Sequence, residues 1–204
     1  MQEPFSVIFS IGNFLAHYDG LRNKILTSIP ASYPLRPYYV GVACVSMAAW
    51  FFSSVFHTRD FVVTEQLDYF AAGASVLYGM YYTPIRVFRL DRYPRVVIKL
   101  WTIVCLSLYA AHVAYLKMWK WDYGYNMTAN VIVGAIQNAL WSWFSYNRYK
   151  RSKRAWAVWP GIVVAWLLVA MSLELLDFAP LWGSIDAHSL WHLGTIAPTV
   201  LWYK

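Results

Sequence analysis

The chain has 204 residues, of which 59% are hydrophobic and only 13% are charged, whereas a soluble domain has about 25% charged residues. Apolar runs of about 20 residues recur, and each is long enough to cross about 30 Å of hydrocarbon as a helix. The net charge of +7 does not indicate nucleic-acid binding, because membrane proteins concentrate Lys and Arg on their cytoplasmic side. Composition therefore excludes a soluble domain and predicts a single all-α, polytopic membrane domain over residues 1–204.

The apolar runs predict a bundle of seven transmembrane helices. The first run, residues 4–25, is the weakest because "HYDG" interrupts it. The others follow at 38–57, 66–83, 95–116, 127–146, 155–176 and 187–203. The third contains "AAGAS", whose small side chains allow neighbouring helices to approach closely. Cys44 and Cys105 both lie inside apolar runs, which predicts buried structural thiols and no disulfide framework.

Charge in the connecting loops predicts the orientation of these helices. The loops after the first, third and fifth runs are basic, and "NRYKRSKR" after the fifth has five basic residues and no acid. The loops between them carry mixed or acidic charge. Because basic loops face the cytoplasm, the amino terminus is predicted to face the lumen or exterior and the carboxyl terminus the cytoplasm.

Three histidines and an aspartate gather at the lumenal end of this arrangement. The second helix ends at His57, the third begins near Asp68, and "DAHSLWH" opens the last helix with His188 and His192. A spacing of four residues places His188 and His192 on one helix face, and it does the same for Ser53 and His57. Three imidazoles at one depth match the three protein ligands of a catalytic zinc site, which keeps its fourth position for water.

This arrangement predicts a metal-dependent hydrolase. Zinc lowers the pKa of its bound water to about 7, Asp68 is the predicted general base, and Ser53 is the predicted hydrogen-bond donor to the oxyanion. Ser54 competes with Ser53 by position, and capping of the third helix is the alternative role of Asp68. For His17 and His112 we expect only ordinary hydrogen bonds to neighbours, whereas ionisable groups clustered inside a membrane are usually functional.

Other polar residues near the same end have two open interpretations. Glu174 and Asp177 in "SLELLDFAP" either orient a ligand histidine or mark a solvated helix end. Asp186 either orients a histidine or caps the last helix. In "WDYGYNMTAN", the side chain of Asn126 or Asn130 is the candidate for binding a polar headgroup of the substrate.

Four stretches, "FHTRD…TEQLDYF", "DYGYNMTANV", "LELLDF" and "DAHSLWH", together resemble the post-GPI-attachment fatty-acid-remodelling phospholipases. These belong to the CREST superfamily, with the alkaline ceramidases and the adiponectin-type receptors. The resemblance runs from "QEPFS" to about "GTIAP". It implies a seven-helix membrane hydrolase with zinc on His57, His188 and His192, assisted by Ser53 and Asp68.

The resemblance also implies a substrate and a compartment. The family removes the sn-2 unsaturated acyl chain from GPI-anchored proteins, in the endoplasmic reticulum or Golgi membrane, with the active site facing the lumen. The implied partners are therefore GPI-anchored proteins and membrane lipid, and no obligate protein partner is evident. Family members carry a signal peptide and a cysteine-rich lumenal segment before "QEP". Neither is present here, so the sequence is interpreted as a trimmed core or an incomplete gene model.

Two alternative functions remain open. The first is an amide hydrolase acting on ceramide, because the same zinc chemistry cleaves both bonds; only "DYGYN" and "LELLDF" favour the GPI substrate. The second is a seven-helix lipid receptor with a structural zinc ion. A structural site normally has four protein ligands, and Asp68 is the candidate for the fourth.

Overall fold

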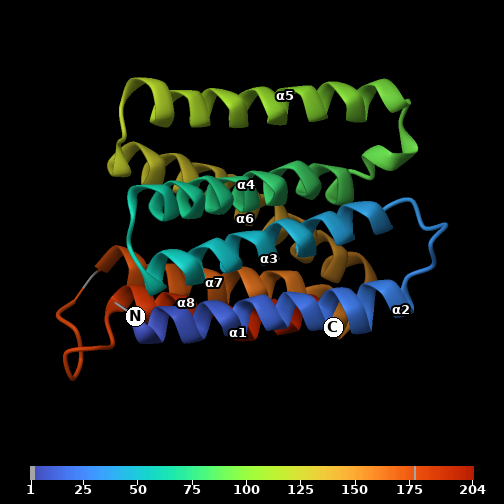
Figure 1. Ribbon diagram of the computed structural model, residues 1–204. Helices are drawn as coiled ribbons and strands as arrows, with labels where there is room; N and C mark the ends of the chain where they lie inside the picture. Colours follow the sequence, from blue (N-terminus) through green and yellow to red (C-terminus); the bar gives the residue numbers. More distant parts are fainter. Residues whose placement is uncertain (1–2, 177) are drawn as a thin grey trace.

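Seven long helices account for most of the computed structural model, which describes residues 3–176 and 178–204 (Figure 1). Their bounds are α1 Pro4–Gly20, α3 Arg36–Thr58, α4 Val62–Val87, α5 Arg95–Ala114, α6 Tyr123–Ser152, α7 Trp159–Leu176 and α8 Ala187–Trp202. Short helical segments extend or join them: η1 Leu21–Ile25, α2 Leu26–Ser28, η2 Leu90–Arg92, η3 Tyr115–Trp119 and η4 Ala155–Val158. The predicted all-α chain with seven helices is confirmed.

Several helices extend beyond the predicted apolar runs. α4 starts four residues before the predicted run and ends four residues after it, and α6 is longer than its run at both ends. Hydropathy detects the apolar part of a helix, whereas capping sets its true end. At the start of α6, for example, the Asp122 carboxylate accepts a hydrogen bond from the Tyr125 amide at 3.0 Å.

Six of the helices form a closed ring. Each packs against the next in the order α1, α3, α4, α6, α7, α8, and α8 packs against α1 again. The remaining helix, α5, packs against α4 and stands outside the ring at the top of Figure 1. Because consecutive long helices run in opposite directions, the end of α3 and the start of α8 lie at the same end of the bundle.

The bundle buries both apolar and polar side chains in its interior and exposes large apolar ones on its surface. Small or polar side chains are buried where helices meet, including Ser6, Ser10, Asn13, Ser53, Thr83 and Thr195. Large apolar side chains such as Leu106 and Val169 are exposed on the outside. This distribution is typical of helices packed in lipid, where small and polar residues mediate the contacts between helices.

Within the described residues, three helical stretches are long and apolar enough to cross a membrane, judged by length and composition: Arg36–Thr58, Arg95–Trp119 and Ala155–Leu175. α8 has only 16 residues, fewer than the roughly 20 of a typical crossing, whereas α1 continues without a break through η1 and α2 to Ser28. α4 and α6 are long enough, and acids or amides interrupt their apolar character.

The prediction that both cysteines are buried is wrong for Cys44. Cys105 is buried, whereas Cys44 is exposed, and both are free thiols. The neighbouring Ala43 is completely buried, so Cys44 points away from the ring. A uniformly apolar run does not reveal which of its residues face the protein and which face lipid.

Candidate metal centre

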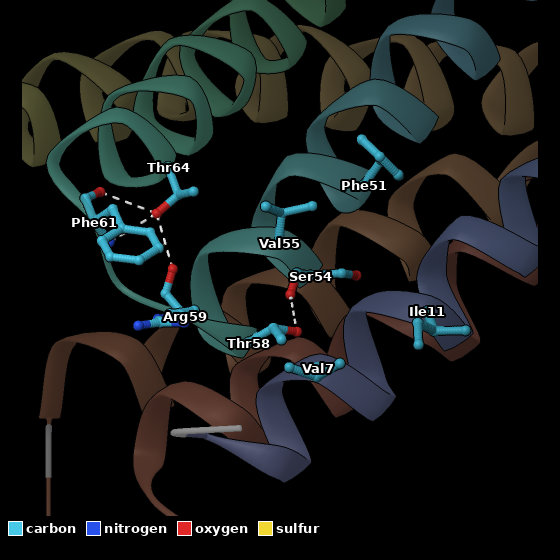
Figure 2. A pocket seen from close by; sticks show the side chains of 9 residues that line it. All are labelled: Val7, Ile11, Phe51, Ser54, Val55, Thr58, Arg59, Phe61 and Thr64. Carbon is cyan, nitrogen blue, oxygen red and sulfur yellow. Dashed lines mark hydrogen bonds between the residues drawn. The ribbon is translucent and has the colours of Figure 1, made fainter.

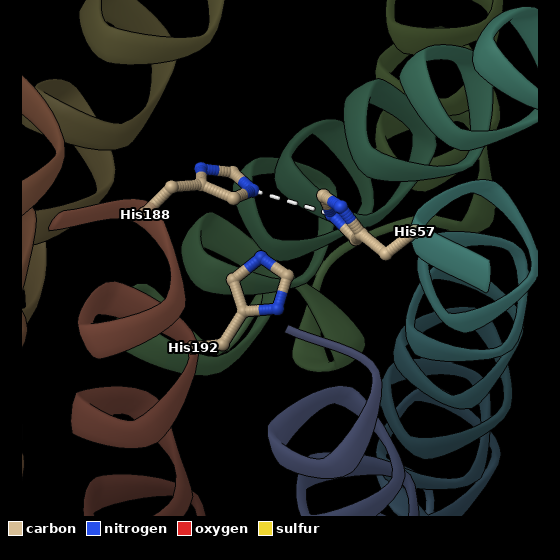
Figure 3. A group of neighbouring side chains, drawn as sticks. All are labelled: His57, His188 and His192. Atoms are coloured by element: carbon tan, nitrogen blue, oxygen red, sulfur yellow. Dashed lines mark hydrogen bonds between the residues drawn. The ribbon is translucent and has the colours of Figure 1, made fainter. Parts of the chain in front are cut away.

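Three histidines from two helices converge at one end of the ring (Figure 3). His57 lies in the last turn of α3, and His188 and His192 lie in the first turns of α8. One ring nitrogen from each lies within 4.8 Å of the other two, and the Nε2 atoms of His57 and His188 are 3.3 Å apart. The structure therefore brings together the three residues that the sequence predicts as metal ligands.

The first turn of α8 is fixed by its cap. The Asp186 carboxylate accepts a hydrogen bond from the Ser189 amide at 2.7 Å, and the Ser189 hydroxyl lies 3.1 Å from the Asp186 amide. This reciprocal pair is a capping box, which satisfies amide groups that have no partner within the helix. Of its two predicted roles, Asp186 therefore makes the capping contact, which keeps His188 and His192 on the same face of α8.

Two carboxylates hold two of the imidazole rings. The Nδ1 atom of His57 lies 2.6 Å from Oε2 of Glu3, and the Nδ1 atom of His188 lies 2.7 Å from Oε2 of Glu174. The hydrogen bond from His57 also lowers the pKa of Glu3 below its usual value. Because an ionised carboxylate only accepts hydrogen bonds, each Nδ1 carries the hydrogen and each Nε2 lone pair faces the centre.

The third ring is held by α1. The Nδ1 atom of His192 lies 2.9 Å from the Ser10 hydroxyl and 3.2 Å from the Ser6 carbonyl oxygen. Since a carbonyl only accepts, Nδ1 donates here as well, and Nε2 faces the other two rings (Figure 3). All three histidines thus present Nε2 to one point.

Three imidazole nitrogens are a donor set that fits a divalent metal such as zinc, and one pair of them already has the spacing of a tetrahedral site. Two nitrogens bound at about 2.05 Å to a tetrahedral zinc ion lie about 3.3 Å apart, which matches the separation between His57 and His188. Two lone pairs facing each other at that distance repel unless a metal cation or a shared proton lies between them. The hydrogen-bonded Nδ1 atoms are the arrangement that orients histidine ligands in metal sites.

The predicted catalytic residues lie in different settings. The Ser53 hydroxyl is buried and lies 3.1 Å from the Ser10 hydroxyl, so it reaches His192 through Ser10. Asp68 on α4 is half-buried, and its charge acts on His57 and His188. Among the described residues, no hydrogen-bond partner of the Asp68 carboxylate is found. His57 and His192 are buried and His188 is partly exposed, so the centre is most accessible on the His188 side.

The remaining candidates divide between the centre and other parts of the bundle. Glu174 contacts a ligand histidine, as described above, while Asp177 lies outside the described residues. Asn130 donates to the Asn126 carbonyl at 3.0 Å and to its side chain at 3.2 Å. A Cβ placed on Gly73 of α4 would lie 3.5 Å from His112 Nε2 and 3.9 Å from Asn130 Oδ1. The two asparagines therefore contact each other, α4 and α5 rather than the three histidines.

Sequence reasoning missed Glu3, Ser6 and Ser10. Glu3 stands directly before the first apolar run, and no spacing or motif in the sequence connects it to a histidine. Ser6 and Ser10 are four residues apart, the same spacing that singled out Ser53 and His57. That spacing was an available signal, although it does not indicate which helix the two serines face.

Comparison of the sequence with known proteins places the chain in a family. The profile of the Per1-like family matches residues 1–204. The chain is 46% identical over 201 residues to the Schizosaccharomyces pombe "Protein PER1 homolog", covering 98% of this chain and 60% of that protein. It is 41% identical over 205 residues to the human "GPI-specific phospholipase A2-like PGAP3", covering 100% of this chain and 62% of that protein.

A Drosophila melanogaster relative, "Post-GPI attachment to proteins factor 3", is 39% identical over 206 residues, covering 100% of this chain and 61% of that protein. The chain thus spans about 60% of the length of these relatives. No solved structure matches it. The family match over the whole chain and the agreement of all these relatives lead to one conclusion: the chain belongs to the Per1-like family.

Proposed function

We propose that this chain is the single-domain, seven-pass membrane core of a zinc-dependent hydrolase that removes the sn-2 acyl chain from the lipid of GPI-anchored proteins. The observation that carries the proposal is the convergence of three Nε2 atoms, each held by a partner on Nδ1. The names of the relatives, which specify a GPI-specific phospholipase A2-like protein, support the substrate. The loop charges support a lumenal site in the endoplasmic reticulum or Golgi membrane.

In this proposal, His57, His188 and His192 hold the zinc ion. Bound zinc supplies a Lewis acid and an acidified water molecule. Glu3 and Glu174 keep the His57 and His188 rings aimed at the centre by accepting their Nδ1 hydrogens. These two carboxylates also add negative charge beside neutral imidazoles, which raises the basicity of the ligand nitrogens.

Asp68 is the proposed general base. Ester hydrolysis adds one water molecule across the acyl–oxygen bond, so one proton leaves the water and another reaches the departing glycerol oxygen. Asp68 acts on His57 and His188 through its charge, and no neighbour among the described residues occupies its oxygens. Its carboxylate is therefore free to accept the proton from water and return it to the leaving oxygen.

Ser53 is the proposed donor to the oxyanion. Its hydroxyl is bonded to Ser10 in this structure, so this role requires it to turn toward the substrate. Ser54 is the weaker candidate, because its hydroxyl donates to the Trp50 carbonyl at 2.8 Å. Asn126 and Asn130 remain candidates for binding the substrate headgroup, at the α4–α6 contact.

The receptor alternative is less well supported by the geometry. A structural zinc site requires a fourth protein ligand, and the group of possible ligand atoms within the described residues consists of three histidines without Asp68. The ceramidase alternative uses the same donor set, so the geometry does not separate it from the GPI hydrolase. The names of the relatives favour the GPI lipid.

Fatty-acid release from a purified GPI lipid tests the proposal. We expect the protein in lipid nanodiscs to release the sn-2 fatty acid, and we expect His192→Ala or a chelator to abolish release. Ceramide in the same assay is the comparison substrate. Release that persists after substitution of His57 would contradict the proposed chemistry, and preferential cleavage of ceramide would replace the proposed substrate.

A further inference from the structure

A groove separate from the metal centre lies between α1, α3 and the start of α4 (Figure 2). Its volume is about 480 Å³, within the range of about 300–1,000 Å³ for ligand pockets. Val7 and Ile11 form the α1 wall, and Phe51 and Val55 form the α3 wall. The groove opens on the outer surface of the ring, where the exposed side chains are mostly large and apolar.

The hydroxyl groups along this groove are already satisfied. Ser54 donates to the Trp50 carbonyl at 2.8 Å, and Thr58 donates to the Ser54 carbonyl at 2.7 Å. Thr64, on the opposite side, donates to the Arg59 carbonyl at 3.0 Å. Because these hydroxyls are bonded to the backbone, they offer little to a polar ligand. The groove therefore suits an apolar chain.

One end of the groove carries a cation. The Arg59 guanidinium lies over the Phe61 ring, 4.7 Å from its centroid, a stacking that holds it at the rim. In the part of the chain that the structure describes, no carboxylate forms an ion pair with Arg59. An apolar groove that ends at a guanidinium with no ion pair among the described residues complements an acyl chain attached to an anionic group. Guanidinium groups bind phosphate in two-point geometry.

The groove and the candidate metal centre use neighbouring faces of the same two helices, because consecutive residues lie about 100° apart around a helix. Thr58 and Arg59 directly follow the metal-centre residue His57, and Val7 directly follows Ser6, whose carbonyl holds His192. Arg59 therefore lies at the same end of the bundle as the three histidines. A lipid held in the groove by its chain and its charge has its glycerol at that end.

We propose that this groove binds the phosphatidyl part of the substrate, with one acyl chain between α1 and α3 and the phosphate on Arg59. This inference rests on the proposed function. A GPI lipid carries two acyl chains and a phosphate on one glycerol, so seating the retained chain and the phosphate leaves the second ester near His57. Ceramide has no phosphate, so the Arg59 contact selects glycerophospholipid over ceramide.

Binding of a non-hydrolysable lipid tests the groove without requiring catalysis. The probe is a diether phosphatidylinositol, with the uncharged diether glycerol as its comparison, and occupancy is measured by native mass spectrometry of the purified protein. We expect Arg59→Gln to weaken phosphatidylinositol binding about tenfold, as for loss of one charge-assisted hydrogen bond, and to leave the uncharged lipid unaffected. Val55→Trp fills the groove, and we expect it to weaken both.

Matched variants separate the groove from general surface effects. Lys120→Gln removes a lysine paired with Asp122, and Val169→Trp enlarges an exposed side chain on α7; both are expected to bind the probe normally. Ile11→Trp fills the groove from the α1 wall, so the groove can still be tested if Val55→Trp fails to fold. Unchanged probe binding in Arg59→Gln, or in both tryptophan variants, would overturn the inference.

The same variants distinguish failure of the groove from failure of the proposed function. Probe binding in His192→Ala is expected to match wild type, because the groove does not depend on the histidines. If His192-dependent hydrolysis occurs, Arg59→Gln should raise KM with little change in kcat. If probe binding depends on Arg59 but the protein hydrolyses no GPI lipid, lipid binding in the groove is supported and the proposed hydrolase function is contradicted. If hydrolysis occurs and is unchanged by substitution of Arg59 and Val55, the hydrolase function is supported and lipid binding in the groove is contradicted.

Discussion

Glu3 contacts His57 twice across 54 positions of sequence: its carboxylate lies 2.6 Å from Nδ1, and its amide donates to the His57 carbonyl at 3.2 Å. The start of α1 and the end of α3 are thereby joined at the metal centre. The His57 ring, a candidate metal ligand, is consequently oriented by a residue outside its own helix, so the candidate centre depends on the packing of α1 against α3.

Substitution of Glu3 should weaken metal binding. Glu3→Ala removes the acceptor for the His57 Nδ1 hydrogen, and loss of such a partner typically costs 10–100-fold in metal affinity. Glu3→Gln retains an acceptor oxygen and should lose much less. Affinity for Zn²⁺ is measured by competition with a chromophoric chelator, with Glu65→Gln on α4 as the control. Equal affinity in wild type and Glu3→Ala would contradict the orienting role.

Ser53→Ala separates two roles of its hydroxyl. If Ser53 stabilises the oxyanion, its loss should reduce kcat by about 10²–10³ and leave zinc affinity unchanged. If it only supports Ser10, the effect should appear instead in zinc affinity, because Ser10 contacts His192. Steady-state kinetics and zinc titration on the same preparation decide between them. Ser46→Ala is the matched control, because the Ser46 hydroxyl on the same helix contacts Ser75.

The loop between α4 and α5 provides a pH-dependent contribution to stability. Arg89 makes two hydrogen bonds to Asp91, at 2.8 and 2.7 Å, which lower the pKa of Asp91. The ionised carboxylate is therefore favoured in the folded state. The stabilisation should be complete above about pH 4, the unfolded value, and should disappear as the pH falls through the lowered folded value.

Thermal unfolding of wild type and Asp91→Asn from about pH 6 to about pH 2.5 checks this dependence. For a partly exposed pair we expect a difference of at most about 1 kcal/mol at the higher pH. The difference should vanish at the acidic end. If the stability difference between wild type and Asp91→Asn increased as the pH fell, the predicted direction of the pH dependence would be wrong.

Two glycines should differ sharply in their tolerance of alanine. A Cβ at Gly20 would meet the ring of Tyr203, whose hydroxyl is fixed 2.8 Å from His17 Nδ1. A Cβ at Gly73 would meet nothing closer than 3.5 Å, the distance to His112 Nε2. We expect Gly20→Ala to destabilise the protein by about 1–3 kcal/mol. Gly73→Ala should be nearly neutral, and comparable losses in the unfolding midpoint would contradict this difference.

The sequence predicts the helices and the clustering of the three histidines at one end of the bundle, and the reason is physical. Helix order and loop charge place His57, His188 and His192 at one end, and the four-residue spacing places two of them on one face. The partners of these rings were largely missed. Pairing of Glu3 with His57 and of Ser10 with His192 depends on which helices are neighbours and how each is rotated. The apolar pattern of a membrane helix leaves that rotation undetermined, as the exposed Cys44 also shows.

The outermost helix has a role that its sparse packing hides. α5 adds little to the ring, yet it carries the chain from one end of the bundle back to the other. Without α5, α6 would start at the opposite end of the bundle, and α6, α7 and α8 would each run in the opposite direction. The two histidines of α8 would then open at the far side from His57, so a helix that contacts none of the three ligands decides whether they can meet.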